Sequence, residues 1–317
     1  LRWTEDQKDG DYMITLNNPA ANLLAAPETT LGMERDDSKT TWFGNVNWYA
    51  TEEIMLFATA STGYKSGGFN SQSSGRTPLG EERRIFAPEE TTNYELGVKS
   101  TLLNGAMTAN ATLYRMEIDD FQDRAFDGVS FIVLNAGELR QQGVEADINW
   151  APIEQLRIVA GVSYLDSEYL DFEGAPALPL GQPQDLTGER RTYSPEWQTS
   201  LSADWTQAFG NDMEWFLGGS WSWLDEQNVG ASSNNDPQSE QDSYSIVNAR
   251  VGLRSASGTW DVTLFGNNLT DEDYCETIFD TPLAPLLGAA NPVNNTSVMR
   301  CALGAPTTWA VRGTFRF

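Results

Sequence analysis

The sequence predicts an all-β protein, a transmembrane antiparallel up-and-down β-barrel, from three observations. Hydrophobic and polar residues alternate with period two along the chain, as they do when successive side chains of a strand point to opposite faces. The alternating segments are about 10–14 residues long, whereas strands of soluble proteins are typically about 5–6. Short and long connections follow one another in turn, which places all short turns on one rim of a barrel.

Period two recurs throughout the chain; for example, Val144, Ala146 and Ile148 alternate with Glu145 and Asp147. The segments 197–205, 247–254, 260–264 and 309–317 repeat this pattern. A soluble β-sandwich also alternates, so the segment lengths decide for a barrel. The whole chain holds about twelve such strands, which begin near residues 1, 40, 53, 91, 106, 137, 155, 193, 213, 244, 259 and 307.

The connections separate into two classes. Short ones are predicted at 50–52, 104–105, 151–154, 210–212 and 255–258. Long polar ones are predicted near 10–39, 66–90, 120–136, 170–192, 228–243 and 271–306. If the last strand runs toward the periplasm, every short turn lies on the periplasmic side and every long loop is extracellular.

The strand near residue 106 contains one irregularity, because its apolar parity slips between Leu113 and Tyr114. A β-bulge would produce such a slip, and so would an exit from the membrane band. Aromatic residues gather near the short turns and predict a periplasmic girdle at the lipid headgroups. These residues are Trp48, Tyr49, Trp150, Trp205, Phe209, Trp215 and Trp260.

Composition excludes several classes of function. No apolar run reaches the roughly 18 residues of a membrane-spanning helix. The formal net charge of −25 disfavours nucleic acid as a partner. It fits either a solubilising acidic surface or acidic loops that divalent cations bridge to lipopolysaccharide. With no histidine in the sequence, Ser-His-Asp and Cys-His catalysis are excluded, and we expect no enzyme activity and no cofactor.

Cys275 and Cys301 are the two cysteines of the chain and bracket a single segment. Their spacing fits a local disulfide in an oxidising compartment, and free thiols in a cytosolic protein are the alternative. The chain begins Leu1-Arg2-Trp3 with no signal sequence, so a cleaved signal or a fragment is expected, and the strand count favours a fragment.

Four stretches, in order, resemble the TonB-dependent receptor family of outer-membrane proteins. They are residues 63–70 (GYKSGGFN), 88–97 (PEETTNYELG), 135–145 (NAGELRQQGVE) and 267–274 (NNLTDEDY). The end of the chain, with Trp309, Val311, Phe315 and Phe317 at alternate positions, is similar to the family's signal for barrel assembly. Gly304-Ala305-Pro306 departs from the Gly-Arg-Pro that often precedes the family's final strand.

The resemblance implies that residues 1–317 are the C-terminal portion of a barrel of about 22 strands with a plugged lumen. The plug domain and the TonB box would lie outside this chain. It implies TonB-coupled uptake of a scarce ligand across the outer membrane of a Gram-negative bacterium. A ferric siderophore is the default ligand, and cobalamin or an oligosaccharide remains open.

Ligand contacts are expected in the extracellular loops and the upper lumen, because a barrel wall presents only its loops and inner face. Phe69, Arg83 and Arg124 lie in such loops and fit an anionic aromatic ligand by stacking and charge pairing. The run Glu81-Glu82-Arg83-Arg84 is expected to be a solvated charge cluster. Because Cys275 and Cys301 both fall within the last long loop, we predict that their disulfide forms.

Three other functions remain open. A passive porin complete at about twelve strands would conduct ions on its own. An outer-membrane barrel enzyme would need chemistry that avoids histidine. A soluble secreted β protein would stay in water without detergent.

Overall fold

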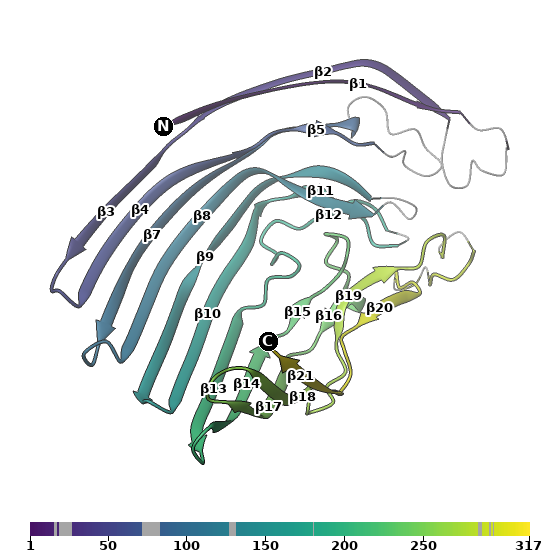
Figure 1. Cartoon of the computed structure of the whole chain (residues 1–317). Helices are drawn as coiled ribbons and strands as arrows, with labels where there is room; N and C mark the ends of the chain where they lie inside the picture. Colours follow the sequence, from purple (N-terminus) through teal and green to yellow (C-terminus); the bar gives the residue numbers. More distant parts are fainter. Residues whose placement is uncertain are drawn as a thin grey trace.

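The computed structural model describes residues 1–15, 18, 27–71, 83–126, 131–179, 181–284, 287–291, 293 and 295–317. Eleven strands form one curved antiparallel sheet in which each strand pairs with its neighbour along the chain (Figure 1). They are β3 (Phe43–Tyr49), β4 (Ile54–Lys65), β7 (Glu89–Leu102), β8 (Met107–Phe126), β9 (Phe131–Ile153), β10 (Leu156–Asp171), β13 (Trp197–Phe209), β14 (Met213–Leu224), β17 (Tyr244–Ser255), β18 (Trp260–Asn267) and β21 (Thr308–Phe315). The predicted antiparallel all-β barrel class is confirmed.

Smaller hairpins accompany this sheet in the described residues. The longest joins β1 (Arg2–Ile14) to β2 (Glu28–Thr41), and β2 leads into β3 through Trp42. The others pair β5 (Gly68–Phe69) with β6 (Ile85–Phe86), β11 (Glu173–Ala175) with β12 (Gln184–Asp185), β15 (Gln227–Asn228) with β16 (Glu240–Gln241), and β19 (Cys275–Asp280) with β20 (Met299–Leu303). One short 3-10 helix, η2, spans Pro237–Ser239.

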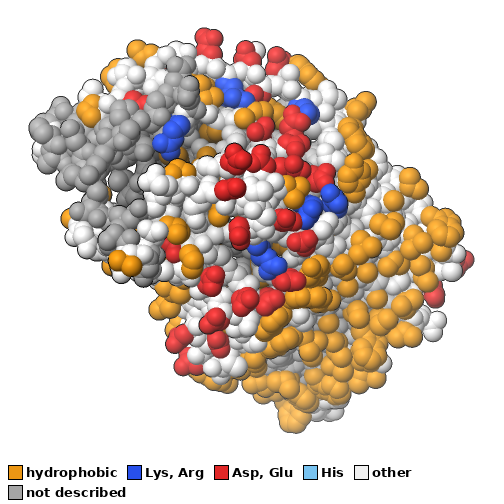
Figure 2. Space-filling view, turned by 180° about the vertical axis from the view of Figure 1, so that it is seen from behind, with side chains coloured by type: hydrophobic (Ala, Val, Ile, Leu, Met, Phe, Trp, Pro, Cys, Tyr) orange, Lys and Arg blue, Asp and Glu red, His pale blue; other side chains and the backbone are white. Residues whose placement is uncertain are grey.

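The two faces of the sheet differ in chemistry. In one cross-strand row, Trp205 pairs with Leu217, Leu217 with Val251, Val251 with Leu264, and Leu264 with Val311. Leu217 remains 49% exposed and Val311 72% exposed, as expected of side chains that face lipid. Figure 2 shows such hydrophobic side chains gathered in a continuous area beside a zone of charged residues.

The adjacent row points to the other face and carries charged side chains. It runs Asp204, Gly218, Arg250, Phe265 and Ala310. A strand whose apolar face meets lipid turns its polar face to the lumen, so this is the inner wall.

The strands end where the sequence predicts short turns. The intervals between strands at 50–53, 103–106, 154–155, 210–212 and 256–259 are all short. Gly105 and Gly210 adopt positive φ angles of 87° and 67° in two of these turns, a conformation that costs glycine little. The prediction of a short-turn rim is therefore confirmed.

Two predicted long loops are largely strand. Within 10–39, β1 continues to Ile14 and β2 begins at Glu28; residues 16–17 and 19–26 lie outside the described part. Within 120–136, β8 continues to Phe126 and β9 begins at Phe131. These loop bounds were wrong because a strand that rises above the membrane no longer needs an apolar face, so its alternation fades from the sequence.

The parity slip in β8 is not a β-bulge. Leu113 pairs with Val144 and Tyr114 with Gly143 in an unbroken register, and Leu113 is 52% exposed on the outer face. The register is also unchanged further along, since Asp119 pairs with Glu138 and Phe121 with Ala136, although Asp120 between them has a φ of 53°. The slip in hydrophobicity therefore marks the exit from the apolar band.

The predicted aromatic girdle is supported for all of its members except Tyr49. Trp48 pairs with Leu56 on the outer face, as does Trp260 with Phe315. Tyr49 pairs with Met55, in register with Lys99 on the inner wall. It therefore does not belong to the lipid-facing ring.

The compact hydrophobic core lies above the apolar band. Ile118, Leu139 and Tyr169 pair across β8, β9 and β10 and are almost completely buried. Phe172 and Leu186, from the β10–β12 region, pack against them. In the described residues no helix is long and apolar enough to cross a membrane.

Candidate functional site

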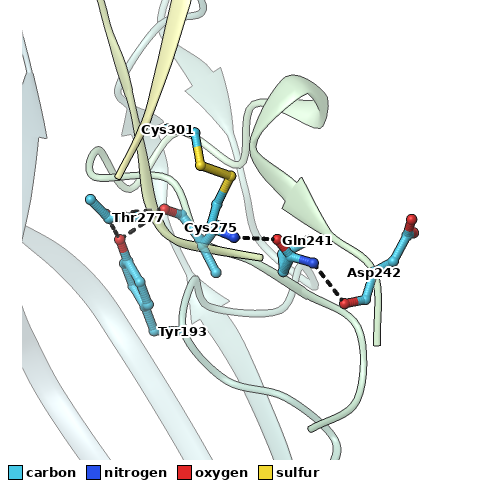
Figure 3. Close-up of a disulfide and its surroundings, with 7 residues drawn as sticks. Tyr193, Gln241, Asp242, Cys275, Thr277 and Cys301 are labelled. Carbon is cyan, nitrogen blue, oxygen red and sulfur yellow. Dashed lines mark hydrogen bonds between the residues drawn. A yellow bond between two sulfur atoms is a disulfide. The ribbon is translucent and has the colours of Figure 1, made fainter. Parts of the chain in front are cut away.

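The long connections on one rim pack against one another. We call the described residues of 66–88, 172–196, 225–243 and 268–307 the loop layer. Cys275 and Cys301 are joined by a disulfide across the β19–β20 hairpin, with their Cα atoms 5.5 Å apart (Figure 3). The backbone N–H of Cys275 donates to Oε1 of Gln241 at 2.8 Å, which ties this hairpin to the preceding loop.

A second junction forms around Val229. Its carbonyl accepts from the hydroxyl of Tyr193 at 2.8 Å and from the N–H of Ile278 at 2.9 Å. The N–H of Ala231 donates to the carbonyl of Ile278 at 2.8 Å. Three segments far apart in sequence therefore share one hydrogen-bonded core, which holds the roof of the site in a defined shape.

Among the described residues, side-chain amides take the place of backbone partners at four positions. In each, one Asn or Gln side chain donates to, and accepts from, the backbone of a single residue, and we call this arrangement an amide clamp. Asn70 clamps Val133 at 2.8 and 2.7 Å, Asn135 clamps Ala87 at 3.1 and 2.8 Å, Gln238 clamps Ser297 at 3.3 and 2.9 Å, and Asn268 clamps Glu272 at 2.9 Å in both directions. An irregular loop can thereby satisfy buried backbone groups without a regular ladder.

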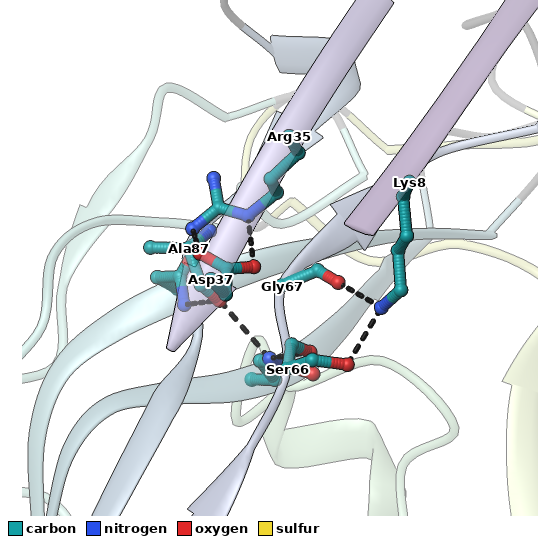
Figure 4. A network of polar contacts seen from close by, with 8 residues as sticks. Lys8, Arg35, Asp37, Ser66, Gly67 and Ala87 are labelled. Carbon is teal, nitrogen blue, oxygen red and sulfur yellow. Dashed lines mark hydrogen bonds and ion pairs between the residues drawn. The ribbon is translucent and has the colours of Figure 1, made fainter. Parts of the chain in front are cut away.

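The β1–β2 hairpin is fastened to the loop that follows β4. Lys8 donates to the hydroxyl of Ser66 at 2.6 Å and to the carbonyl of Gly67 (Figure 4). Arg35 pairs with Asp37 at 2.6 Å beside them. A Cβ on Gly67 would lie 2.3 Å from Nε of Arg35, so this close approach requires glycine.

Arg84 is a structural residue that sequence reasoning missed. It is fully buried, pairs with Glu28 at 2.7 Å and lies 3.6 Å from the ring centroid of Tyr12. It also donates to the carbonyl of Asn70 at 2.6 Å. The expectation of a solvated charge cluster was therefore wrong for Arg84; Glu81 and Glu82 lie outside the described residues. The partners Glu28 and Tyr12 belong to a distant hairpin, so no local pattern reveals this burial.

Phe69 and Arg83 both belong to the connection that follows β4. Phe69 is in β5, and a Cβ built on Gly10 of β1 would lie 3.9 Å from its ring, so the ring packs close to β1. Arg83 is exposed, and its carbonyl accepts from Nδ2 of Asn70 at 3.1 Å. Arg83 is therefore exposed at the surface, whereas part of the Phe69 ring packs against β1.

Arg124 lies near the tip of the β8–β9 hairpin. Its guanidinium is exposed and lies 5.9 Å from the ring centroid of Phe131. It pairs with Val133, the residue that Asn70 clamps. Arg124 and the segment with Phe69 and Arg83 are therefore linked through one clamp, although no direct contact joins their described side chains.

The inner wall carries a row of arginines toward the short-turn rim. Arg250 pairs with Asp204 at 2.6 Å, across the space that Gly218 leaves free, and Arg254 pairs with Glu214 at 2.7 Å. Arg312 lies 5.1 Å from the ring centroid of Phe265. The wall is therefore polar and paired, which suits a hydrated lumen or a polar protein surface.

Two acidic residues near the loop layer, Asp123 and Asp271, have protein partners. Asp123 accepts from the buried hydroxyl of Tyr169 at 2.8 Å. Asp271 accepts from the hydroxyl of Thr307 at 2.8 Å and from its N–H at 3.2 Å, and these bonds hold the pKa of Asp271 below its ordinary value. In the described part of the chain, no group of three or more His, Cys, Asp or Glu side chains is arranged for a metal.

An antiparallel sheet with an apolar outer face, a polar inner face, short turns at one rim and packed loops at the other defines the wall of an outer-membrane β-barrel. A family model described as "TonB dependent receptor-like, beta-barrel" matches residues 2–269. The chain belongs to this family of TonB-dependent receptors, as its sequence motifs predict.

Two similar proteins carry names that refer to ferrichrome and to ferric pyoverdine. The ferrichrome outer membrane transporter/phage receptor of Escherichia coli (strain K12) is 28% identical over 262 residues, which cover 78% of this chain and 30% of that protein. The ferric-pyoverdine M114 receptor PbuA of Pseudomonas sp. (strain M114) is 28% identical over 64% of this chain and 24% of its own length. The chain thus spans about a third or less of these relatives.

A solved structure has the same fold. The ferric yersiniabactin uptake receptor FyuA from Yersinia pestis superposes with a TM-score of 0.71 at 15% identity, over 92% of this chain and 39% of that one. The family places the chain in the outer membrane of a Gram-negative bacterium, as expected from the sequence. The family is one of receptors and transporters.

Proposed function

We propose that the protein that carries this chain takes up a ferric siderophore across the outer membrane by TonB-coupled active transport. The observation that carries this proposal is a polar inner wall roofed by a loop layer that its clamps and disulfide hold in place. The names of the relatives, which refer to ferrichrome and ferric pyoverdine, support a siderophore in preference to cobalamin or an oligosaccharide.

Ligand capture is proposed at two exposed cations, one in the loop layer and one near the tip of the β8–β9 hairpin. Arg83 and Arg124 supply positive charge in a chain whose net charge is −25, and Arg124 has the ring of Phe131 beside it. Phe69 would offer a stacking surface next to Arg83. Such a set suits an anionic aromatic chelate, since guanidinium groups both pair with anions and stack on rings.

Energy coupling is proposed to come from a plug domain and a TonB box outside this chain. The inner wall supports this because its arginine row forms a polar surface for another protein segment. The sheet order also supports a longer barrel of about 22 strands, because β3 and β21 end the order and do not pair with one another in the described residues.

Lipopolysaccharide is the proposed partner of the outer face above the apolar band. Arg140 pairs there with Glu168, and Arg115 pairs with Glu117 on the adjacent strand. Charges of both signs in this position fit phosphate groups that arginines bind directly and that acidic residues bind through divalent cations.

The passive porin is the second candidate, and an enzyme is not proposed because the chain contains no histidine. A porin complete at about twelve strands must close its sheet on itself. In the described residues β3 and β21 do not pair with one another, which argues against such closure.

The test is binding and uptake by the full-length protein. Intrinsic tryptophan fluorescence should fall on addition of ferrichrome, ferric pyoverdine or ferric yersiniabactin, and iron uptake should require TonB. The double variant R83A/R124A should bind the same chelate about tenfold or more weakly, since it loses two charge contacts. Asp185→Asn, an exposed loop residue, is the matched control.

Two results would count against the proposal. Full-length protein that binds none of the ferric chelates removes the siderophore, and ion conductance without any need for TonB favours the porin. Retained binding in R83A/R124A would leave the transport function standing and move the ligand site elsewhere in the loop layer.

A further inference from the structure

A cavity of about 90 Å³ lies where three segments of the loop layer meet the β8–β9 hairpin. Its walls are mainly apolar and include Phe126, Phe131, Phe279 and Met299. One carboxylate, that of Asp280 at the end of β19, also lines it. The cavity is too small for a siderophore, so it is not the capture site proposed above.

Three buried oxygens, one of them on the carboxylate that lines this cavity, have no hydrogen-bond partner in the described part of the chain. They are Oδ1 of Asp280, Oδ2 of Asp236 and Oγ of Ser297. Asp236 is 2% exposed and Ser297 is 9% exposed. Neither carboxylate takes part in an ion pair among the described residues. An unpartnered buried polar group is costly and calls for an explanation.

Local geometry brings these oxygens to one place. Asp280 pairs with Met299, and the ladder continues as the N–H of Thr281 donates to the carbonyl of Val298 at 2.9 Å. Side chains alternate along such a ladder, so Ser297 lies on the same face of the hairpin as Asp280.

Helix η2 brings the second carboxylate to that face. Gln238 clamps the backbone of Ser297, and the backbone N–H of the same Gln238 donates to Oδ1 of Asp236 at 2.9 Å. Asp236 therefore caps η2 with one carboxylate oxygen and leaves the other free beside Ser297.

We propose that Asp236, Asp280 and Ser297 form a seat for a calcium ion that joins the loop after β14 to the β19–β20 hairpin. Two carboxylates and a hydroxyl are hard oxygen ligands, and backbone carbonyls and water complete the six to eight oxygens that calcium takes. Calcium suits this irregular set better than magnesium, which demands near-ideal octahedral geometry. With two carboxylates, affinity belongs in the range of extracellular calcium modules.

The protonation of Asp280 is consistent with this seat. Burial, and then the negative charge of Asp236, raise the pKa of Asp280 to about 6. Burial also raises the pKa of Asp236. A bound divalent cation would remove the repulsion between the two carboxylates and return both to their ionised forms.

The test uses the full-length protein in detergent at neutral pH and equilibrium dialysis against radioactive calcium. Wild-type protein should bind one ion at this seat, with a Kd on the order of 10⁻⁴–10⁻³ M. Asp280→Asn and Asp236→Asn should each weaken that binding by about tenfold or more, because each removes a charged ligand. Asparagine at 236 can still accept from Gln238, so the cap of η2 remains.

Asp271→Asn is the matched control, because Asp271 is an exposed loop carboxylate already held by Thr307. It should bind calcium as the wild type does. Calcium should also slow proteolysis of the segment 227–243 in the wild type and not in Asp280→Asn. The proposal is overturned if wild-type protein binds no calcium at millimolar concentration or if Asp280→Asn binds as well as wild type. It is likewise overturned if Asp280→Asn resists proteolysis better than wild type without calcium while binding is unchanged, since the two carboxylates then share a proton instead.

Discussion

The sheet and the loop layer are stabilised in different ways. In the sheet, every strand is held by a backbone ladder, and its side chains need only be apolar toward lipid and polar toward the lumen. In the loop layer, individual side chains replace the ladder: four amide clamps, a disulfide and buried ion pairs hold irregular backbone. The hydrophobic core lies where the upper parts of β8, β9 and β10 meet the loop layer. In the sheet, a substitution should therefore lower stability when it exchanges an apolar side chain for a polar one or the reverse. In the loop layer, it should lower stability whenever it removes the particular side chain that makes the contact.

The largest effect is expected from the disulfide. Replacing both Cys275 and Cys301 with serine opens a loop whose ends are 26 residues apart. The free energy of unfolding should fall by about 3–4 kcal/mol, because the unfolded chain gains conformational entropy. The segment 275–301 should open more often and be cut faster by protease, while heat-modifiable migration of the barrel stays unchanged. Equal cleavage of the variant and the wild type would show that hydrogen bonds alone fix this hairpin.

A charge on the lipid-facing side of the sheet should lower the free energy of unfolding almost as much as loss of the disulfide. Leu217 lies on the outer face of β14, between Trp205 and Val251, so Leu217→Arg should lower the free energy of unfolding by about 2–4 kcal/mol. Urea unfolding in lipid vesicles measures this. Ser220→Arg, on the inner face of the same strand, is the control and should cost much less. If both variants cost the same, the assignment of faces fails.

The smallest of the three effects is expected at a clamp. Asn70 is 6% exposed and clamps Val133. Asn70→Ala leaves backbone groups of Val133 unpaired and should lower the free energy of unfolding by about 1–3 kcal/mol. Hydrogen exchange should rise at Val133 and in residues 83–88. Asn45→Ala on β3 removes an exposed amide of the sheet and should leave exchange unaltered. Faster exchange in both variants would show that side-chain amides stabilise the sheet and the loop layer alike.

Three of the four clamps lie in the motifs that carry the family resemblance. Asn70 ends GYKSGGFN, Asn135 begins NAGE, and Asn268 lies in NNLTDEDY. The motifs were visible in the sequence, but their role was not, because the partners of Asn70 and Asn135 are 63 and 48 residues away. Asn268 also shows a φ of 46°, which asparagine tolerates better than most residues. A motif rich in Asn and Gly at a strand end is therefore a signal for a loop clamp.

The sequence by itself determined the strands, the short turns and the face of nearly every residue in the sheet. It did so because alternation is a property of neighbouring residues and the bilayer demands it in every strand. It failed where that demand ends, at Gly10–Ile14, in the upper parts of β8 and β9, and at Tyr49.

Only the tertiary structure decided how the loop layer is built. The burial of Arg84 against Glu28, and the meeting of Asp236, Asp280 and Ser297, depend on segments brought together from distant parts of the chain. No periodic pattern specifies such pairs, because each arises from the particular path of a loop over the rim. The contacts that build the loop layer therefore lie where the sequence alone is least informative.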